Sequence, residues 1–236
     1  MADRASSGFL GSLTLEEHRA FLRLGRRRRF RGGAALFREG ERSGGLLAVL
    51  SGRVKVSSFT DEGKEIIITI RGTGELLGED FAIDGEPRSA SGTALGPVEA
   101  LEVDTEAFTE FLQKYPRVGL VLLRMVNRRL REATRWRIVR GSHDLTERVA
   151  ARLDDLADRY GEASGSRVRI LLPLTQEELA GWVGVSREAV SKALRELRAR
   201  GWIETHRRGV RCSTATHCAC ARSSRNRTPL VPSLLQ

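Results

Sequence analysis

One short stretch of the sequence, residues 78–89, carries side chains that could bind an anion. Arg88 and Ser89 are adjacent, and together they can hold a phosphate through charge-assisted hydrogen bonds. Upstream, Gly78 permits a close approach of the backbone, and Glu79 can accept a hydrogen bond from a ribose 2′-hydroxyl. The same residues are also compatible with a solvated Glu–Arg pair on a surface loop, so the stretch alone leaves both interpretations open.

A second region carries the signals of two short helices joined by a tight turn. Thr175 and Glu178 have the spacing of a capping box, so a helix should begin here and end at Gly184. Ser186 can cap a following helix over Arg187–Arg200. Such a helix-turn-helix places its second helix in the DNA major groove. Apolar residues are spaced to pack the two helices together: Leu179, Ala180, Val183, Val185, Val190, Ala193, Leu194 and Leu197.

The first turn of that second helix carries side chains able to read bases. Arg can bond bidentately to guanine, Glu can accept from cytosine N4, and Lys can reach guanine or phosphate. A basic hairpin follows, whose arginines are expected to contact phosphates. A helical hairpin with merely solvated charges is disfavoured by the glycine turn, the two caps and this basic wing. Double-stranded DNA is therefore the expected partner of Thr175, Ser186, Arg187, Glu188, Ser191, Lys192, Arg207 and Arg208.

Composition and charge are compatible with a nucleic-acid partner without requiring one. The 236-residue chain has 40 Lys and Arg against 30 Asp and Glu, a formal net charge of +10. More than half of the excess lies in residues 200–236, where seven arginines accompany the single acid Glu204. A solvated basic tail would have the same composition, so charge does not decide the function.

Membrane and disulfide-rich classes are disfavoured. No stretch approaches the roughly 20 unbroken apolar residues of a membrane helix, and Met1–Gly8 lacks the pattern of a secretory signal. Cys212, Cys218 and Cys220 lie close together, whereas a disulfide framework would spread them along the chain. Their spacing fits no common zinc site, so we expect no metal. A cytoplasmic protein without a membrane partner is expected.

The N-terminal half has the texture of an all-β unit. Short apolar runs are separated by glycine-containing turns at about ten-residue spacing, the rhythm of a small antiparallel barrel or sandwich. Val54 and Val56 alternate with polar neighbours, as half-buried strands do. Thr14 and Glu17 form a capping box for a preceding helix. We expect strands within Ala35–Phe37, Leu46–Leu50, Val54–Val56, Glu65–Ile70 and Val98–Val103, and helices at Leu13–Leu24 and Thr105–Lys114.

A long helix is expected over Pro116–Arg140, because Pro116 suits a first turn and an apolar repeat follows. Leu123, Val126, Leu130 and Ala133 recur at the spacing of a coiled-coil seam. The stripe could instead pack on the chain's own barrel. We favour parallel self-pairing and hence a homodimer.

The C-terminal half should begin after a break at Gly141–Ser142. Asp144 then has the capping partner Glu147 and starts a helix that runs to about Tyr160. The remaining expectations are a flexible loop at Gly161–Ser166, a strand at Val168–Leu172, and a hairpin around His206–Gly209.

With these features in place, the sequence over about residues 10–211 resembles the cyclic-AMP receptor (CRP/FNR) family of transcription regulators. Leu77–Ser91 resembles the family's phosphate-binding cassette, Val185–Lys192 its recognition helix, and Asp61–Glu65 a family turn. The resemblance implies an α+β fold: a cyclic-nucleotide-binding antiparallel β-barrel (double-stranded β-helix), a long dimerisation helix and a winged helix-turn-helix. The implied domains are residues 8–115, 116–140 and 141–213, followed by residues 214–236 as a disordered tail or an aberrant end of the reading frame.

The resemblance also implies a ligand site, with two departures. The residues assigned to it are Gly78, Glu79, Asp80, Arg88, Ser89, Arg129, Ala133 and Thr134. Family members that read adenine have Thr then Ser where this chain has Ala133 and Thr134, so half of the base-reading pair is missing. Lys192 stands where many relatives have Arg, which weakens bidentate reading of guanine. The N-terminal cysteines of the iron–sulfur branch are absent from the sequence.

The resulting prediction is a homodimeric transcription regulator controlled by a cyclic nucleotide, cyclic AMP, with RNA polymerase as a further partner. One alternative is the same regulator responding to another ligand, such as cyclic GMP or cyclic di-GMP, or to none. Another is an enzyme with a cyclic-nucleotide-gated regulatory module. No nucleophile–base pair or metal-ligand set supports that class, and we expect a protein that is not an enzyme.

Overall fold

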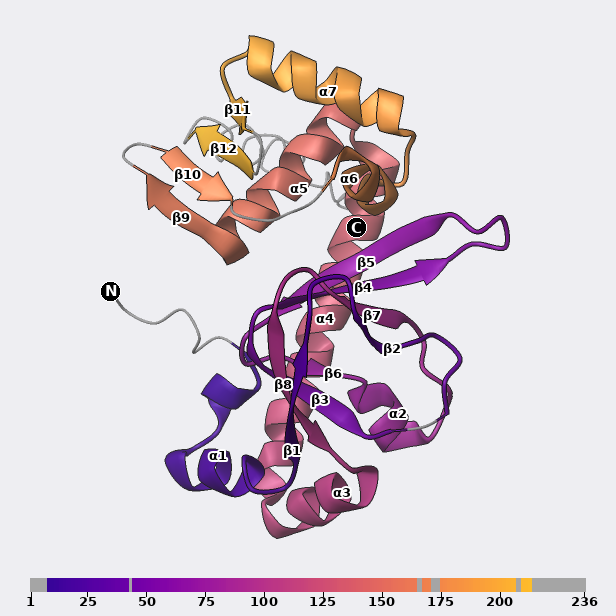
Figure 1. Cartoon of the computed structure of the whole chain (residues 1–236). Helices are drawn as coiled ribbons and strands as arrows, with labels where there is room; N and C mark the ends of the chain where they lie inside the picture. Colours follow the sequence, from indigo (N-terminus) through magenta and orange to yellow (C-terminus); the bar gives the residue numbers. More distant parts are fainter. Residues whose placement is uncertain (1–7, 43, 165–166, 171–174, 207–208, 214–236) are drawn as a thin grey trace, which may run out of the picture. The chain divides into compact units, whose positions relative to one another are not determined.

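The computed structural model describes residues 8–42, 44–164, 167–170, 175–206 and 209–213. It divides into two compact units, Met1–Arg137 and Ile138–Gln236 (Figure 1). Helix α4 (Pro116–Ser142) contributes residues to both units. Residues 214–236, including two of the three cysteines, and the wing arginines Arg207 and Arg208 lie outside the described residues.

The first unit is built on two antiparallel sheets of four strands each, in agreement with the antiparallel barrel that the sequence predicts. One sheet has the order β1-β8-β3-β6 and the other β2-β7-β4-β5. All five strands expected from the sequence are present. The strands are β1 (Arg26–Phe30), β2 (Ala35–Phe37), β3 (Leu46–Ser51), β4 (Arg53–Phe59), β5 (Glu65–Gly72), β6 (Leu76–Leu77), β7 (Ser91–Ala94) and β8 (Val98–Val103).

Strand β1 was not predicted, because its sequence is four arginines and a phenylalanine and shows no apolar alternation. It pairs along its length with β8, which supplies acidic partners. Arg28 lies 2.8 Å from Glu102, and Arg27 lies 3.2 Å from Glu99. A sheet-edge position lets such charged side chains remain in water while the backbone pairs. The acids that make this strand possible are remote in the sequence, so no local pattern reveals it.

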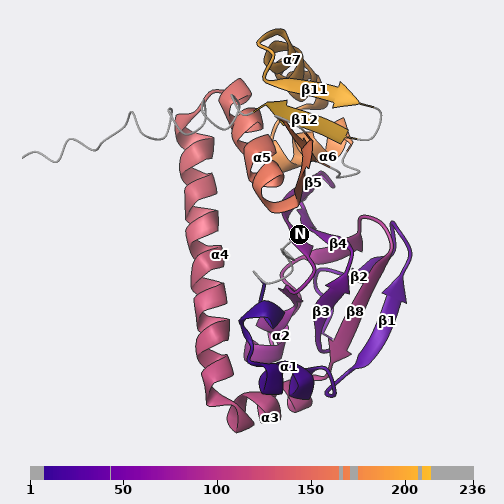
Figure 2. The same ribbon diagram turned by 90° about the vertical axis from the view of Figure 1, so that its left-hand side faces the viewer.

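The short helices of the first unit cover the side of its barrel on which α4 begins (Figure 2). The 3-10 helix η2 (Leu10–Ser12) and α1 (Leu15–Phe21) precede the strands, α2 (Glu79–Asp84) follows β6, and α3 (Thr105–Lys114) follows β8. The predicted capping box of α1 is present: the Glu17 backbone N–H donates to Thr14 Oγ1 at 3.3 Å, and the Thr14 N–H donates to Glu17 Oε2 at 2.8 Å.

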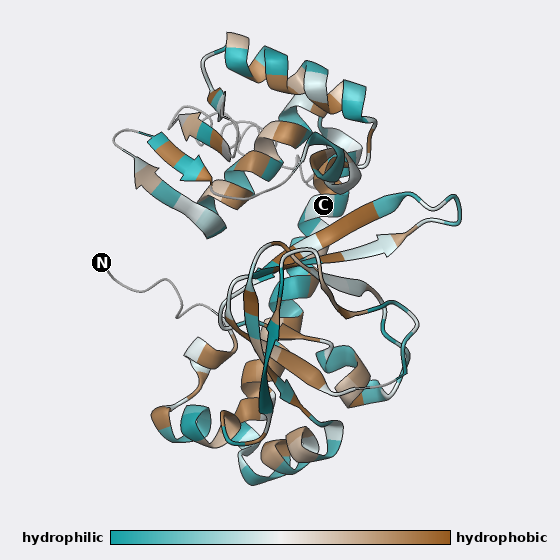
Figure 3. Ribbon diagram, in the orientation of Figure 1, coloured by the Kyte–Doolittle hydropathy of each residue, from teal (hydrophilic) through white to brown (hydrophobic). Residues whose placement is uncertain are grey.

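The core of this unit joins the sheet to these helices, and apolar residues gather there (Figure 3). Phe21 is fully buried, and its ring packs edge-on against Phe9, Phe108 and Phe111 at centroid distances of 5.5, 6.4 and 5.4 Å. One face of α4 completes the same cluster with Val118, Val121, Leu122 and Met125. The first half of α4 is therefore an integral part of the barrel's core.

A charged contact joins α1 to the start of α4. The Arg117 guanidinium donates through Nε to Glu17 Oε1 at 2.8 Å, and Arg117 Nη2 donates to the Ser12 carbonyl at 3.1 Å. The hydrogen bond from Arg117 lowers the pKa of Glu17 to about 2, with Thr14 assisting against the effect of burial. The carboxylate of the capping box thus also fixes the beginning of the long helix.

The second unit places three helices on a small sheet. Its strand order is β11-β12-β10-β9. The elements are α5 (Leu145–Tyr160), β9 (Gly161–Ser164), β10 (Arg167–Ile170), α6 (Gln176–Val183), α7 (Arg187–Ala199), β11 (Ile203–His206) and β12 (Gly209–Ser213). The capping boxes predicted at Asp144 and Thr175 are both present. None of the helices among the described residues is long and apolar enough to cross a membrane.

One local expectation was wrong, and one helix boundary is displaced by two residues. Gly161–Ser164 is not a loop but strand β9, which pairs antiparallel with β10. Its backbone hydrogen-bond partners come from β10, and its own sequence, which contains Gly and Ser, gives no sign of a strand. The long helix ends at Ser142, within the expected break and two residues beyond the expected end at Arg140. Gly141 costs some helix stability but does not end a helix by itself.

The ring cluster predicts a large difference between two phenylalanines of this unit. Replacing buried Phe21 by Ala should lower the free energy of unfolding by about 3–5 kcal/mol, because a cavity remains among the other rings. The same change at Phe59, which is 55% exposed, should cost below about 0.5 kcal/mol. Urea denaturation followed by circular dichroism measures both. Equal losses in the two variants would contradict the packing described here.

Candidate functional site

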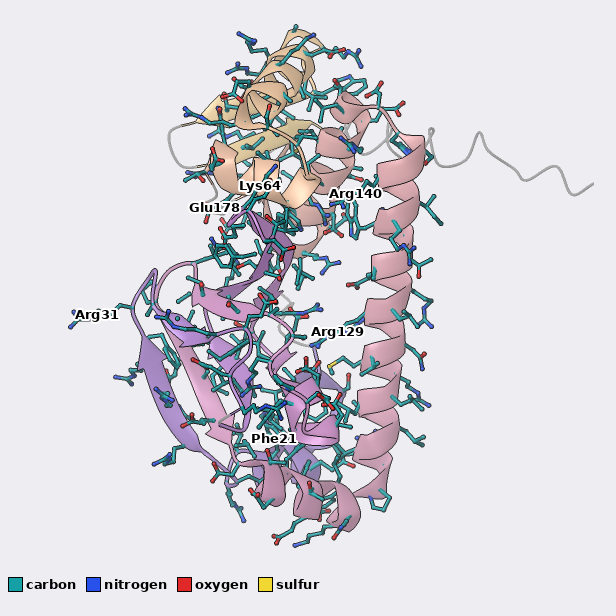
Figure 4. The ribbon with its side chains drawn as sticks, turned by 90° about the vertical axis from the view of Figure 1, so that its right-hand side faces the viewer. Phe21, Arg31, Lys64, Arg129, Arg140 and Glu178 are labelled. Carbon is teal, nitrogen blue, oxygen red and sulfur yellow. The ribbon has the colours of Figure 1, made fainter. Side chains whose placement is uncertain are left out.

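A cavity of about 120 Å³ opens in the first unit between the strands, α2 and α4. Six of the eight residues expected in a ligand site line it, namely Gly78, Glu79, Asp80, Arg88 and Ser89 from the barrel side and Arg129 from α4. Figure 4 shows Arg129 directed from α4 toward the barrel. The structure therefore assembles the cassette and the long helix around one space.

Arg88 is held in this cavity by carbonyls and rings. It is 4% exposed. Its guanidinium donates to the Gly78 carbonyl at 3.0 Å and to the Gly45 carbonyl, and it stacks between Phe37 and Phe81 at 4.9 Å from each centroid. Burial lowers the pKa of Arg88, and the charge of Asp80 is the largest opposing influence. The side chain is oriented before any ligand arrives.

Gly78 is required at its position for two reasons. Its φ of +71° lies in the left-handed region. A Cβ there would lie 1.7 Å from Arg88 Nη1. The close approach that the sequence predicted for a ligand is thus made, in this structure, by the chain's own arginine.

Glu79 and Arg129 form a buried ion pair that joins α2 to α4. Arg129 Nη2 also donates to the Leu76 carbonyl at 2.8 Å. Burial raises the pKa of Glu79, and the charge of Arg129 counteracts it. Burial also lowers the pKa of Arg129, and Glu79 counteracts that in turn. Each charge is tolerated in the cavity because of the other.

Three buried polar atoms of this cluster have no hydrogen-bond partner among the described residues: Glu79 Oε2, Arg88 Nε and Arg129 Nε. One is an acceptor, and the other two carry N–H donors. A ligand that presents a hydroxyl donor together with anionic oxygens could satisfy all three. Buried polar groups are normally paired, and these three atoms belong to residues that line one cavity, so the cavity is a candidate binding site.

Some residues differ from the sequence expectation. Ala133 and Thr134 lie on α4 beyond Arg129, are exposed in the single chain, and do not line the cavity. The Thr134 hydroxyl donates to the Leu130 carbonyl at 3.0 Å. Sequence reasoning missed Arg71, a buried lining residue that donates to Glu75 at 3.1 Å. An arginine at the end of an apolar strand was the available signal.

The second unit forms the predicted helix-turn-helix. Helix α6 ends at Gly184, whose φ of +77° suits its role as a C-cap. Ser186 caps α7 by accepting from the Ala189 N–H at 3.2 Å. Val185 is partly buried. The other residues expected to pack the two helices are buried: Leu179, Ala180, Val183, Val190, Ala193, Leu194 and Leu197.

The first turn of α7 presents its polar side chains to solvent. Arg187, Glu188 and Lys192 are exposed and Ser191 is partly so, while the caps Thr175 and Ser186 are also exposed. Hydrogen bonds from its own backbone N–H and from Ser186 lower the pKa of Glu188, so it is a charged acceptor. The geometry supplies donors and an acceptor on one helix end, which is what reading base edges requires.

Comparison with known proteins identifies a domain in each unit. Residues 27–115 match the model of the cyclic nucleotide-binding domain, and residues 147–213 match that of the Crp-like helix-turn-helix domain. The CRP-like cAMP-activated global transcriptional regulator of Mycobacterium tuberculosis is 36% identical over 187 residues, covering 79% of this chain and 84% of the relative. The chain belongs to the CRP/FNR family. It is accordingly a CRP-like transcription regulator with a cyclic nucleotide-binding domain and a DNA-binding helix-turn-helix.

Other CRP/FNR members place this regulator within a group of varied effectors. The cAMP-activated global transcriptional regulator CRP of Haemophilus influenzae is 31% identical, covering 73% of this chain and 77% of the relative. The solved structure of the c-di-GMP responsive global regulator CLP of Xanthomonas campestris has a TM-score of 0.75 at 26% identity, covering 85% of this chain and 99% of that one. Family membership therefore establishes the fold but does not determine which effector this chain binds.

Proposed function

We propose that the cavity binds a cyclic nucleotide, cyclic AMP, and that binding controls the affinity of the helix-turn-helix for DNA. The observation that carries the proposal is the set of three unpartnered atoms. A cyclic phosphate would accept from Arg88 Nε, and a ribose 2′-hydroxyl would donate to Glu79 Oε2. The mycobacterial and Haemophilus relatives, both named as cAMP-activated regulators, favour cyclic AMP, whereas the CLP structure and the missing threonine at Ala133 keep other cyclic nucleotides as alternatives.

Control would pass through α4. A ligand that binds Glu79 or Arg129 contacts a member of their ion pair, and so it acts on the interaction that joins α2 to the long helix. The same helix continues without interruption to Ser142, at the start of the second unit. A ligand shifts such an equilibrium by the difference between its affinities for the two states. We infer that binding rather than catalysis is the protein's role, that it acts in the cytoplasm, and that RNA polymerase is a further partner.

A homodimer through α4 is the second part of the proposal. The face of α4 that packs on the barrel leaves another row of apolar side chains in water. Leu123, Val126 and Leu130 are 56%, 42% and 64% exposed in the single chain. An exposed apolar row of this kind marks an interaction surface, and its coiled-coil spacing, continued by Ala133, suits a second copy of the same helix.

The effector site is tested by Arg88→Ala. Loss of the buried guanidinium should weaken cyclic nucleotide binding by about 2–5 kcal/mol, because the phosphate loses its charge partner. Isothermal titration calorimetry with cyclic AMP, cyclic GMP and cyclic di-GMP measures this and identifies the preferred base. Arg31→Ala, at an exposed arginine that does not line the cavity, is the matched control. Unchanged affinity in Arg88→Ala would refute the assignment of the phosphate site.

The dimer is tested by Leu130→Asp. A carboxylate at the proposed seam would be desolvated in both copies, which is costly. Analytical ultracentrifugation should show a monomer at concentrations where the unmodified protein is a dimer. Arg131→Asp, an exposed neighbour outside the apolar row, should remain dimeric. A Leu130→Asp variant that sediments like the unmodified protein would show that α4 does not form the interface.

Base reading by the first turn of α7 is tested by Arg187→Ala. Its loss should cost about 1–3 kcal/mol per half-site and relax the preference at one G·C pair. Replacing Arg207 and Arg208 together by Ala should instead weaken binding to all DNA sequences about equally. It should also reduce the slope of log affinity against log salt concentration by roughly one to two. Salt titrations with specific and scrambled duplexes separate the two behaviours. The reverse pattern would assign base reading to the wing.

A further inference from the structure

The hydroxyl of Ser89, which would donate to a ligand phosphate, already has an acceptor within the chain. Ser89 Oγ donates to Asp80 Oδ2 at 2.6 Å. A serine hydroxyl carries a single proton. It therefore cannot donate to the Asp80 carboxylate and to a phosphate at the same time, and ligand binding requires that this bond be given up.

The charge of Asp80 also affects the other ionisable residues of the cavity. It lines the same space as Arg88 and Ser89. Its charge favours the charged form of Arg88, against the larger effect of burial. It adds to burial in raising the pKa of the neighbouring Glu79. Ser89 is exposed and Asp80 is partly buried, so this carboxylate lies where an anion would enter the cavity, and like charges at short range repel.

A structural role at the start of α2 does not account for the contact. Acids in a first helical turn are favoured by the helix dipole, and Glu79 and Asp80 both occupy that turn. That effect needs no partner outside the helix. Asp80 instead reaches to Ser89, which lies beyond the end of α2 and next to Arg88, the residue expected to hold the phosphate.

We propose that Asp80 is an internal anion that competes with the ligand's phosphate for the hydroxyl of Ser89, beside Arg88 in the same cavity, and so sets the affinity of the cavity. This inference rests on the proposed function of the cavity as a cyclic nucleotide site. The phosphate must take over the Ser89 proton and tolerate the remaining carboxylate. The chain consequently responds at a higher effector concentration than the same cassette would without an acid at this position.

The test compares two substitutions on the same helix. Asp80→Asn removes the charge and retains an acceptor for Ser89, and Asp80→Ala removes both. Asp84→Asn is the matched control, because Asp84 ends α2, is exposed and does not line the cavity. Titration calorimetry with cyclic AMP, cyclic GMP and cyclic di-GMP should show binding about tenfold tighter for Asp80→Asn and Asp80→Ala. Asp84→Asn should stay within about twofold of the unmodified protein.

A double-mutant cycle separates competition from a general change in the site. Ser89→Ala should cost less than about threefold in affinity while Asp80 is present, because the hydroxyl is already engaged, and about tenfold in the Asp80→Ala background. Equal costs in the two backgrounds, or unchanged or weaker binding in Asp80→Asn, would overturn the inference while leaving the cavity's proposed function intact. If neither the unmodified protein nor any variant binds a cyclic nucleotide, the proposed function fails, and the inference fails with it.

Discussion

The buried ion pair between Glu79 and Arg129 is the interaction on which the rest of the N-terminal unit's chemistry depends. A carboxylate and a guanidinium are both costly to remove from water, and each is retained here because the other lies against it. The pair also has a topological consequence, since Glu79 begins α2 and Arg129 belongs to α4. Any ligand that alters the balance of charge in the cavity therefore acts on the long helix.

The pair leaves the cavity prepared for a ligand but not satisfied. Arg88 is fixed by two carbonyls and two aromatic rings, so its orientation costs little when a ligand binds. Within the described part of the chain, Glu79 Oε2, Arg88 Nε and Arg129 Nε lack partners, and each such buried group costs about 1–3 kcal/mol. Ligand binding can recover this free energy. The bond between Asp80 and Ser89 opposes it, and the two effects together determine how readily the site is filled.

Helix α4 serves two surfaces at once, which limits how its sequence can vary. Val118, Val121, Leu122 and Met125 complete the barrel core, while Leu123, Val126 and Leu130 remain exposed on another face. The question that the sequence left open, whether the apolar stripe packs on its own barrel, is thereby answered for the described chain: a different set of residues does so. Arg129, on the same helix, lines the cavity and so links α4 to it.

Local signals in the sequence were sufficient for most elements. The capping boxes at Thr14, Asp144 and Thr175 and the turn at Gly184 predicted where helices begin and end, because each depends on residues within one turn of chain. The helix-turn-helix could be predicted as a whole for the same reason. Five of the eight strands of the first unit followed from apolar runs and alternation, while β1, β6 and β7 did not. The cassette residues followed from resemblance to a family.

What only the tertiary structure decided are the contacts between residues far apart in the chain. The arginine strand β1 exists because β8 brings acids opposite it, and Gly161–Ser164 is a strand because β10 supplies its hydrogen-bond partners. Arg71 enters the cavity, and Ala133 and Thr134 stay outside it in the single chain. Composition near each residue carries no record of these pairings, because their energies come from the partners that folding brings into contact.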